Sequence, residues 1–402
     1  MPRRIDAVVA GHICLDIFPA FDAGTGAGGL RPGALYKVGP ALRSTGGAVA
    51  NTGLALHRLG VAVALMGKVG DDPFGQDIQN LIRAEGEHLS AGMKVSPGET
   101  TSYTVVISPP GVDRTFLHCP GCNDTFTSAD LNEAVLQGAR LFHLGYPPLM
   151  RSMYQDGGAE LVAMFQRVKA MGLGTSLDMA DPDAGSEAGK VDWLALLTKV
   201  LPHVDIFVPS VEELLYMIDR PTWDRLMQKG RIDIAVDITP PMLRQLADRL
   251  IAMGTAVVMI KLGDQGAYML VSTDIERIRK MGRCCPYDVL AWIGQEVIEP
   301  CFKARTVAGT TGSGDCTIAG LLAAVLRGIP PLEALPFAVA VGACSVEETD
   351  ATSGVPHLLD VEQRIAAGWE RLLSAIAPTR KSAPAALEAA AVTRPRTPNE
   401  VR

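Results

Sequence analysis

The sequence lacks the excess of positive charge that a nucleic-acid-binding surface needs. Its 402 residues include 37 lysines and arginines against 44 aspartates and glutamates, which leaves a formal net charge of −7. A phosphate backbone is bound mainly by clustered basic side chains. Nucleic acid is therefore not an expected partner of this protein.

The sequence also lacks segments that would anchor or export the chain. No uninterrupted apolar run reaches the length of a membrane-spanning helix. The first residues, MPRRIDAVVAGH, lead directly into a short strand-like run, without the cleavage site that follows a signal peptide. We therefore expect a cytoplasmic location and no membrane partner.

The cysteine spacing is not typical of a zinc site. Among 8 cysteines, Cys119 and Cys122 form a CxxC pair, whereas Cys284 and Cys285 are adjacent. A structural zinc site takes four ligands, usually from two spaced pairs. Zinc binding stays open as an alternative, but we expect reduced thiols that act as small apolar residues.

The residues that are present predict a large α/β domain. Hydrophobic residues make up 48% of the chain and charged residues 20%, a balance typical of a globular protein with a sizeable core. Short apolar runs typical of buried strands occupy residues 7–10, 61–66, 141–144, 175–178, 206–208 and 256–260. Helical patterns occupy residues 48–59, 74–84, 129–137, 159–170, 193–200 and 242–252. This alternation predicts a mostly parallel sheet with helices on both faces.

One part of the chain departs from this alternation. Residues 101–108 and 115–119 are rich in strand-forming side chains and are joined by a Pro-Pro-Gly turn, which predicts an antiparallel hairpin. Residues 33–38 supply a candidate third strand. We therefore expect a small antiparallel β lid, with its strands approximately within residues 33–43 and 99–125.

A glycine-rich turn followed by an apolar helix occupies residues 309–327, GTTGSGDCTIAGLLAAVLR. A P-loop has a lysine and a hydroxyl residue after its last glycine, but here Gly314 is followed by Asp315. Apolar residues recur at helical spacing from Cys316 onward, so the helix is expected to begin at Gly314 and Asp315. The backbone N–H groups at this helix start would form an anion site without a basic side chain. They belong to Thr311, Gly312, Ser313 and Gly314.

Asp315 has two interpretations at this helix start. A carboxylate beside a bound phosphate can take the proton of an attacking alcohol, which is what phosphoryl transfer to a hydroxyl requires. Aspartate is also a preferred N-cap residue, with a purely structural role. The stretch alone leaves both interpretations open.

Three stretches together resemble the ribokinase-like (PfkB) family of carbohydrate kinases: STGGAVANTGLALHRLG, VALMGKVGDDPFG and VAGTTGSGDCTIAGLLAAVLRG. The resemblance runs in order over about residues 5–375, and it implies a three-layer ribokinase-like domain with ATP and Mg²⁺ as cofactors. It also implies that Asp315 is the base and that the amides of residues 312–314 hold the transferred group. Residues 376–402, rich in Ala, Pro, Thr and Arg, are expected to form a disordered tail.

The resemblance also implies a set of residues that bind the acceptor sugar or polyol. The segment HCPGCNDTF resembles the family's motif at the end of the lid hairpin. For Asn51, a polar residue on a helix side is the alternative interpretation. The implied acceptor-binding residues are Asp16, Gly46, Gly47, Asn51 and Asn123.

A second implied set binds the nucleotide. IKLGDQGAY resembles the family's turn beside ATP, and Lys261 would add a positive charge near the phosphates. VPSVEELLYM places Glu213 as the residue that organises Mg²⁺ through water, although Ser210 stands where asparagine is usual. A surface glutamate on a helix is the alternative. The implied nucleotide-binding residues are Lys261, Gly263, Gly266 and Thr311.

Two further expectations follow from the resemblance. Gly309 stands where many relatives have an aspartate near the anion site, which makes a monovalent-cation site doubtful. Many relatives pair through their lids, so a homodimer is expected. The expected function is an ATP-dependent kinase of a sugar or polyol hydroxyl. A nucleoside kinase of the same fold and a non-catalytic small-molecule-binding relative are the alternatives.

Overall fold

A nine-stranded sheet forms the centre of the part of the chain that the structure describes. The structure is a computed structural model that describes residues 5–22, 30–109, 115–228 and 234–381. The sheet order is β15-β14-β13-β12-β11-β10-β9-β1-β4, parallel from β4 to β12 and antiparallel from β12 to β15. The strands are β1 (Ala7–Gly11), β4 (Val63–Met66), β9 (Leu141–Gly145), β10 (Gly174–Leu177), β11 (Ile206–Phe207), β12 (Val257–Lys261), β13 (Ala267–Val271), β14 (Glu296–Glu299) and β15 (Thr379–Lys381).

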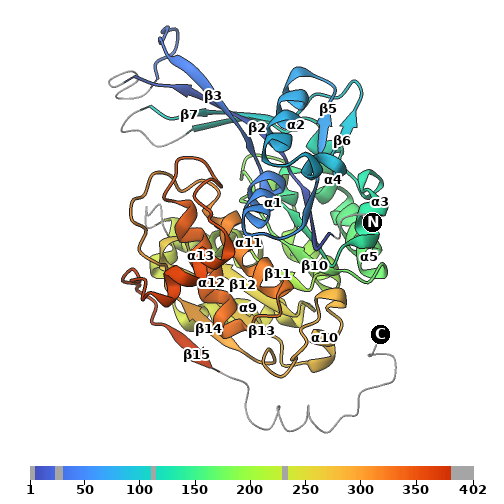
Figure 1. Cartoon of the computed structure of the whole chain (residues 1–402), viewed down its shortest axis with the longest axis vertical. Coiled ribbons are helices and arrows are strands. Elements are labelled where there is room, and N and C mark those ends of the chain that lie inside the picture. The colour runs from blue at the N-terminus through green and yellow to red at the C-terminus, as the bar shows by residue number, and fades with distance from the viewer. Residues whose placement is uncertain (1–4, 23–29, 110–114, 229–233, 382–402) are drawn as a thin grey trace.

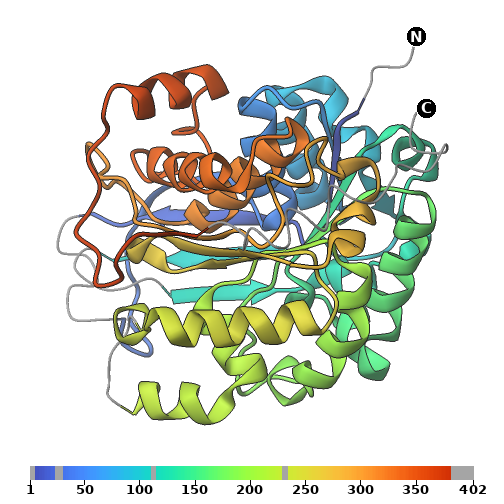
Figure 2. The same cartoon turned by 90° about the horizontal axis from the view of Figure 1, so that it is seen from below.

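Helices cover both faces of this sheet, as Figure 2 shows. In β1, Ala7 and Val9 pack into one apolar cluster, whereas Val8 and Ala10 pack into the other, because successive side chains of a strand point to opposite faces. The first cluster contains residues from α1 (Ala48–Arg58), α2 (Pro73–Glu85), α10 (Ile275–Arg279), α11 (Ser313–Leu326), α12 (Pro331–Ser345) and α13 (Leu358–Ala366). The second contains residues from α3 (Glu133–Gly138), α4 (Arg151–Tyr154), α5 (Ala159–Ala170), α6 (Trp193–Val200), α7 (Val211–Ile218), α8 (Arg220–Met227) and α9 (Pro240–Ala252). The predicted three-layer α/β fold is confirmed.

A second sheet, the lid, projects from the body (Figure 1). Its order is β3-β2-β7-β8, and its strands are β2 (Cys14–Ala20), β3 (Gly39–Gly46), β7 (Tyr103–Ile107) and β8 (Thr115–Cys119). β7 and β8 form the predicted antiparallel hairpin, while most of its predicted Pro-Pro-Gly turn lies outside the described residues. A separate short pair is formed by β5 (Lys68–Gly70) and β6 (Lys94–Ser96).

One prediction about the lid is wrong. The third strand lies at β3 instead of residues 33–38, because the last pair between β2 and β3 joins Ala20 to Gly39 and the earlier residues lie beyond the end of β2. The predicted small antiparallel sheet is present: β2 pairs with β3, and β7 with β8, in antiparallel arrangements, while β2 and β7 pair in parallel. The prediction omitted β2, which follows β1 almost directly and carries the chain from the main sheet into the lid.

The folded chain extends past the boundary expected at residue 375. β15 pairs with β14 in an antiparallel arrangement, and the pairing is supported by charge. Lys381 Nζ lies 3.2 Å from Oε2 of the buried Glu296, and Arg380 Nη2 lies 3.4 Å from Oε2 of the buried Glu299. The rest of the expected tail, residues 382–402, lies outside the described residues. No helix in the described ranges is long and apolar enough to cross a membrane.

Candidate active site

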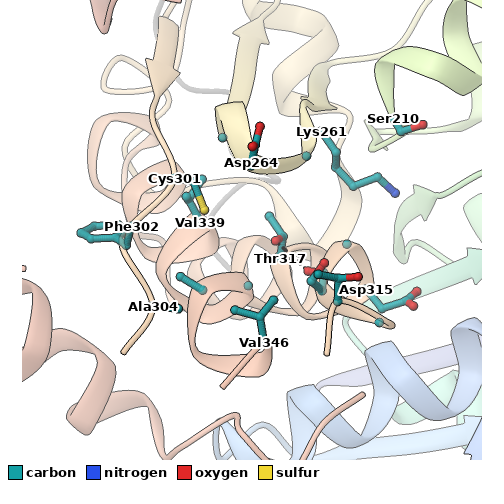
Figure 3. A pocket seen from close by; sticks show the side chains of 18 of the residues that line it. Ser210, Lys261, Asp264, Cys301, Phe302, Ala304, Asp315, Thr317, Val339 and Val346 are labelled. Carbon is teal, nitrogen blue, oxygen red and sulfur yellow. Dashed lines mark hydrogen bonds between the residues drawn. The ribbon is translucent and has the colours of Figure 1, made fainter. Parts of the chain in front are cut away.

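A cleft of about 730 Å³ lies where the parallel strands β10 to β12 end. Its walls include the start of α11 on one side and the turn that joins β12 to β13 on the other. Figure 3 shows Asp315 across this space from Ser210 and Lys261. Ligands of open α/β sheets typically bind at this edge, beyond the carboxyl ends of the strands.

The start of α11 has the backbone geometry of an anion site. Gly312 is the N-cap, with φ of 77°, and a Cβ at this position would lie 2.5 Å from Cβ of Ala351, so only glycine fits. The helix begins at Ser313, one residue earlier than predicted, and the N–H of Ser313 donates to Thr310 O at 3.3 Å. Gly314 follows in the first turn and also lines the cleft, where a helix N-terminus favours negative charge.

Asp315 lines the cleft, although only 3% of the residue is exposed. Its carboxylate is the acceptor of three side-chain hydrogen bonds. Asn51 Nδ2 donates to Oδ2 at 3.0 Å, and Thr52 Oγ1 donates to Oδ1 at 3.3 Å. The hydroxyl of Tyr146 donates to Oδ2 at 2.7 Å. No side-chain cap bond is made at the start of α11, so a capping role does not account for Asp315.

Asn51 therefore has a contact that the resemblance did not imply. It was predicted to bind the acceptor, but its amide nitrogen is bonded to the carboxylate predicted to be the base. Asn51 is 6% exposed and lies on α1, whose start is set by Gly47. This contact joins α1 to α11.

Tyr146 is a cleft residue that sequence reasoning missed. It follows β9 directly and has a left-handed backbone, with φ of 65°, which is uncommon for a residue other than glycine. Burial and the negative charge of Asp315 raise the pKa of Tyr146 well above its usual value, so it remains a hydrogen-bond donor. Its position after a predicted strand, in LGYPP, was the available signal, because polar groups at such strand ends meet at the cleft.

Lys261 lies at the end of β12 and forms an ion pair with a second missed residue, Asp178. Lys261 Nζ lies 2.7 Å from Asp178 Oδ1, and Asp178 is fully buried just after β10. Although burial opposes the shift, Asp178 and other carboxylates raise the pKa of Lys261. A Cβ on Gly314 would lie 3.8 Å from Lys261 Nζ, so the ammonium group adjoins the start of α11.

Ser210 and Glu213 form a capping box at the start of α7. The N–H of Ser210 donates to Glu213 Oε2 at 2.7 Å, and the N–H of Glu213 donates to Ser210 Oγ at 3.2 Å. Both residues also line the cleft. The serine that departs from the family pattern is thus a functioning N-cap that holds Glu213 at the cleft wall.

The polar groups around Lys261 fit a divalent cation that is also bound by phosphate and water. Lys261 is ion-paired with Asp178, and the negative charges of Asp178, Glu213 and Asp315 all raise the pKa of Lys261. Asp178 Oδ2 is buried without a hydrogen-bond partner. No group of three or more His, Cys, Asp or Glu side chains is arranged as a metal cage within the described residues. Mg²⁺ commonly retains waters and uses few carboxylates, so this arrangement suits it.

The turn between β12 and β13 forms the opposite wall. Gly263 and Gly266 line the cleft, with φ of 56° and 100°. A Cβ on Gly266 would lie 2.0 Å from the carbonyl oxygen of Glu299, so the close approach of β14 requires glycine there. Thr311 lies in the turn before α11 but is not a wall residue of this cleft.

The predicted acceptor residues Asp16, Gly46 and Gly47 lie together at the junction of lid and body. Asp16 is on β2, and a Cβ on Gly46 would lie 2.1 Å from Asp16 Oδ2. Burial raises the pKa of Asp16. Gly47 has φ of 86°, and a Cβ there would lie 2.5 Å from Nδ1 of His12. The two glycines therefore leave room for the Asp16 and His12 side chains.

Asn123 has a different environment from the one implied by the resemblance. It is fully buried, its Oδ1 accepts from Ile13 N at 3.3 Å, and its Nδ2 donates to Ile13 O at 2.9 Å. The amide therefore ties the turn after β8 to the chain between β1 and β2. Cys122 beside it is also buried, and its thiol donates to Lys68 O at 3.0 Å.

Gly309 lies beside the carbonyl groups that follow α12. A Cβ at Gly309 would lie 3.1 Å from Thr349 O and 3.3 Å from Glu348 O. A side chain at this position would therefore crowd these oxygens. The doubt about a monovalent-cation site stays a prediction.

A comparison with known families decides the class of the protein. Residues 29–358 match the family described as pfkB family carbohydrate kinase. The chain belongs to the pfkB family of carbohydrate kinases. The resemblance inferred from the sequence motifs is thus confirmed, and with it the expected enzyme class.

Relatives of this pfkB family member include sugar kinases. The chain is 24% identical over 298 residues to an uncharacterized sugar kinase of Archaeoglobus fulgidus, a match that covers 74% of this chain and 96% of the relative. It is 28% identical over 268 residues to a fructokinase of Vibrio alginolyticus, covering 66% and 71%. A ribokinase of Arabidopsis thaliana complexed with ribose and ATP has the same fold, with a TM-score of 0.63, 16% identity and coverage of 90% and 98%.

Proposed function

We propose that this protein transfers the γ-phosphoryl group of ATP to a hydroxyl of a sugar or polyol, with Asp315 as the base. The observation that carries the proposal is the position of Asp315. Its carboxylate lies in the first turn of α11, at the cleft wall, and is oriented by Asn51, Thr52 and Tyr146. A base and an anion site are thus combined at one helix start.

The reaction follows from this arrangement. The acceptor O–H bond breaks as the proton moves to Asp315, and the freed oxygen forms a bond to the γ-phosphorus. The bond between that phosphorus and the oxygen of ADP breaks, so ADP leaves. The N–H groups at the start of α11 stabilise negative charge on the group in transfer, and Lys261 adds a positive charge beside them.

Mg²⁺, when bound, would neutralise part of the negative charge of the ATP phosphates. Glu213, which lines the cleft, is the residue that would hold it through water. The support is the position of Glu213 at the cleft wall, where Ser210 fixes it at the start of α7. One structural neighbour from E. coli, 21% identical with a TM-score of 0.64, is a complex with ATP and Mg²⁺.

The acceptor would occupy the junction of lid and body beside Asp16 and Gly47. Carboxylates and amides suit the vicinal hydroxyls of a polyol. The relatives include a protein described as a sugar kinase and a fructokinase, and one structural neighbour is a ribokinase complexed with ribose and ATP. These names support a sugar or polyol as the acceptor. A lid above the acceptor would exclude water and limit hydrolysis of ATP.

The test is an ADP-release assay over a panel of neutral sugars, polyols and nucleosides, with a sample without acceptor as the baseline. Asp315→Asn is assayed beside the wild type, and ATP affinity is measured for both by calorimetry. We expect sugar-dependent ADP release that falls by about 10²–10⁴-fold in the variant, while ATP affinity is retained. Equal turnover of the two proteins would exclude Asp315 as the base. Turnover of nucleosides alone would assign the nucleoside kinase alternative.

We also propose a homodimer formed through the lid. Leu42 on β3 is 62% exposed, and Phe116 and Leu117 on β8 are 55% and 54% exposed, so both edge strands present apolar side chains to solvent. Light scattering should give the dimer mass for the wild type. Phe116→Glu should shift the mass toward that of the monomer, and a monomeric wild type would exclude the dimer.

A further inference from the structure

Tyr146 connects the proposed base to the lid through a chain of side-chain contacts. Its hydroxyl donates to Asp315 Oδ2 at 2.7 Å. Its ring centroid lies 6.0 Å from that of His12. His12 Nε2 in turn lies 3.3 Å from Nε2 of His118, a residue of lid strand β8. The chain thus runs from the lid, through the loop after β1, to the start of α11.

The contacts of Asp315 leave one of its oxygens more open than the other. Within the described residues, Oδ2 accepts from both Asn51 and Tyr146, whereas Oδ1 accepts only from Thr52, at 3.3 Å. A carboxylate oxygen has about two lone-pair positions. Oδ2 is therefore saturated, and Oδ1 retains a position for a further donor.

We propose that Tyr146 is a positioning residue for phosphoryl transfer, which keeps Oδ2 occupied so that Oδ1 takes the acceptor proton, and which couples Asp315 to the lid through His12 and His118. The inference rests on the proposed function and extends it. It assigns a role to three residues that were not among the predicted site residues. Tyr146 acts through Asp315 and makes no bond to the reacting phosphate.

The backbone of Tyr146 shows that its place is determined by its surroundings. A left-handed conformation disfavours a bulky residue and persists only when neighbouring contacts hold it. Burial, together with the negative charges of Asp315, Asp178 and Glu213, raises the pKa of Tyr146 well above its usual value. The hydroxyl therefore keeps its proton for the bond to Asp315.

The two histidines act as a neutral pair. Burial lowers the pKa of His12 to about 3 and also lowers the pKa of His118. With both rings neutral, one Nε2 donates and the other accepts. His118 Nδ1 also lies 3.0 Å from Thr104 Oγ1 on β7, so the pair links both strands of the lid hairpin to the body.

The first test replaces Tyr146 by Phe, which keeps the ring against His12 and removes only the hydroxyl. We expect kcat to fall about tenfold, as for loss of a hydrogen bond to a charged group, while ATP affinity stays unchanged. The acid limb of the kcat/KM profile should move to higher pH, because the carboxylate loses a donor that favours its charged form. A merely structural role would leave that limb in place, and an unchanged profile would overturn the proposal.

The second test is a double-mutant cycle on kcat between His118→Leu and Tyr146→Phe. If the lid is coupled to Tyr146, the fold-loss of kcat in the double variant is smaller than the product of the two single-variant losses. A fold-loss equal to that product would refute the lid connection. Thr115→Ala, an exposed change on the same strand β8, is the control for general disturbance of the lid and should leave kcat at the wild-type value. Circular dichroism checks that all variants fold.

The outcomes separate this inference from the proposed function. If the wild type releases no ADP with any acceptor, the proposed function fails and the role of Tyr146 fails with it. If the wild type is active and Tyr146→Phe matches it in kcat and pH profile, only the role of Tyr146 fails.

Discussion

Asn51 and Asp315 are 264 positions apart in the sequence, yet Nδ2 of Asn51 donates to Oδ2 of Asp315 at 3.0 Å. The bond joins α1, which begins beside the lid, to α11, which begins at the cleft. The amide of Asn51 on α1 therefore orients the carboxylate of Asp315 on α11. The position of the proposed base depends on the packing of these two helices.

The ion pair between Lys261 and Asp178 is expected to matter for stability as well as for ATP binding. Lys261→Met leaves the buried Asp178 carboxylate without its partner, which typically costs about 3–5 kcal/mol of unfolding free energy. Adding Asp178→Asn removes the uncompensated charge and should restore most of that loss. Urea unfolding of both variants measures the effect. If the Lys261→Met protein is as stable as the wild type, the ion pair does not contribute to stability. ATP affinity should fall in both variants.

Substitutions of Ser210 and Glu213 distinguish the structural role of the α7 capping box from the proposed role of Glu213 in organising Mg²⁺. Ser210→Ala removes the side-chain cap of α7 and should lower the unfolding free energy by about 1 kcal/mol, with little change in the Mg²⁺ dependence of turnover. Glu213→Gln retains an acceptor for the Ser210 N–H but loses the charge. It should raise the Mg²⁺ concentration needed for half-maximal activity. If Glu213→Gln and the wild type need the same Mg²⁺ concentration for half-maximal activity, Glu213 is not the metal-organising residue.

Gly47 can be compared with a second glycine that also has a positive φ. Gly98 has φ of 76° and nothing within 4 Å of a Cβ, whereas a Cβ on Gly47 would lie 2.6 Å from the carbonyl oxygen of His12. Gly98→Ala should cost about 1–2 kcal/mol from backbone strain alone. Gly47→Ala should cost about 1–3 kcal/mol more, because the added methyl group also overpacks its site. Chemical denaturation measures both, and equal losses would show that the space around Gly47 adjusts.

The burial of His143 predicts that the folded protein loses stability in mild acid. It is fully buried on β9, and burial lowers its pKa from 6.5 to about 3. The unfolded chain therefore binds the proton more readily than the folded one below about pH 6.5, so stability falls as the pH falls. From pH 6.5 to pH 5 one such histidine accounts for about 2 kcal/mol.

His143→Gln is the comparison variant for this prediction. The variant should lose about 2 kcal/mol less than the wild type over the same pH interval, as measured by urea unfolding at both pH values. Carboxylates with lowered pKa, such as Glu99 at about 2, contribute mainly at lower pH. Identical losses in the two proteins would show that His143 is not the group responsible.

Local sequence patterns predicted several parts of this protein. The alternation of apolar runs and helical spacing indicated the layered α/β sheet, because burial on both faces leaves its pattern in each short strand. The stretch GTTGSGDC indicated a helix start with open amides, because glycine and aspartate act there through neighbouring backbone atoms. The family motifs indicated several residues that line the cleft, among them Glu213, Lys261 and Asp315.

Only the tertiary structure decided which groups meet Asp315. Tyr146 and Asp178 follow strands β9 and β10 and carry no distinctive local pattern, so their contacts with Asp315 and Lys261 depend on the order of strands in the sheet. The same holds for β2, which becomes a lid strand through pairing with β3 and β7. Sequence patterns record burial and backbone preference over a few neighbouring residues, whereas these contacts join distant segments and arise only when the layers pack.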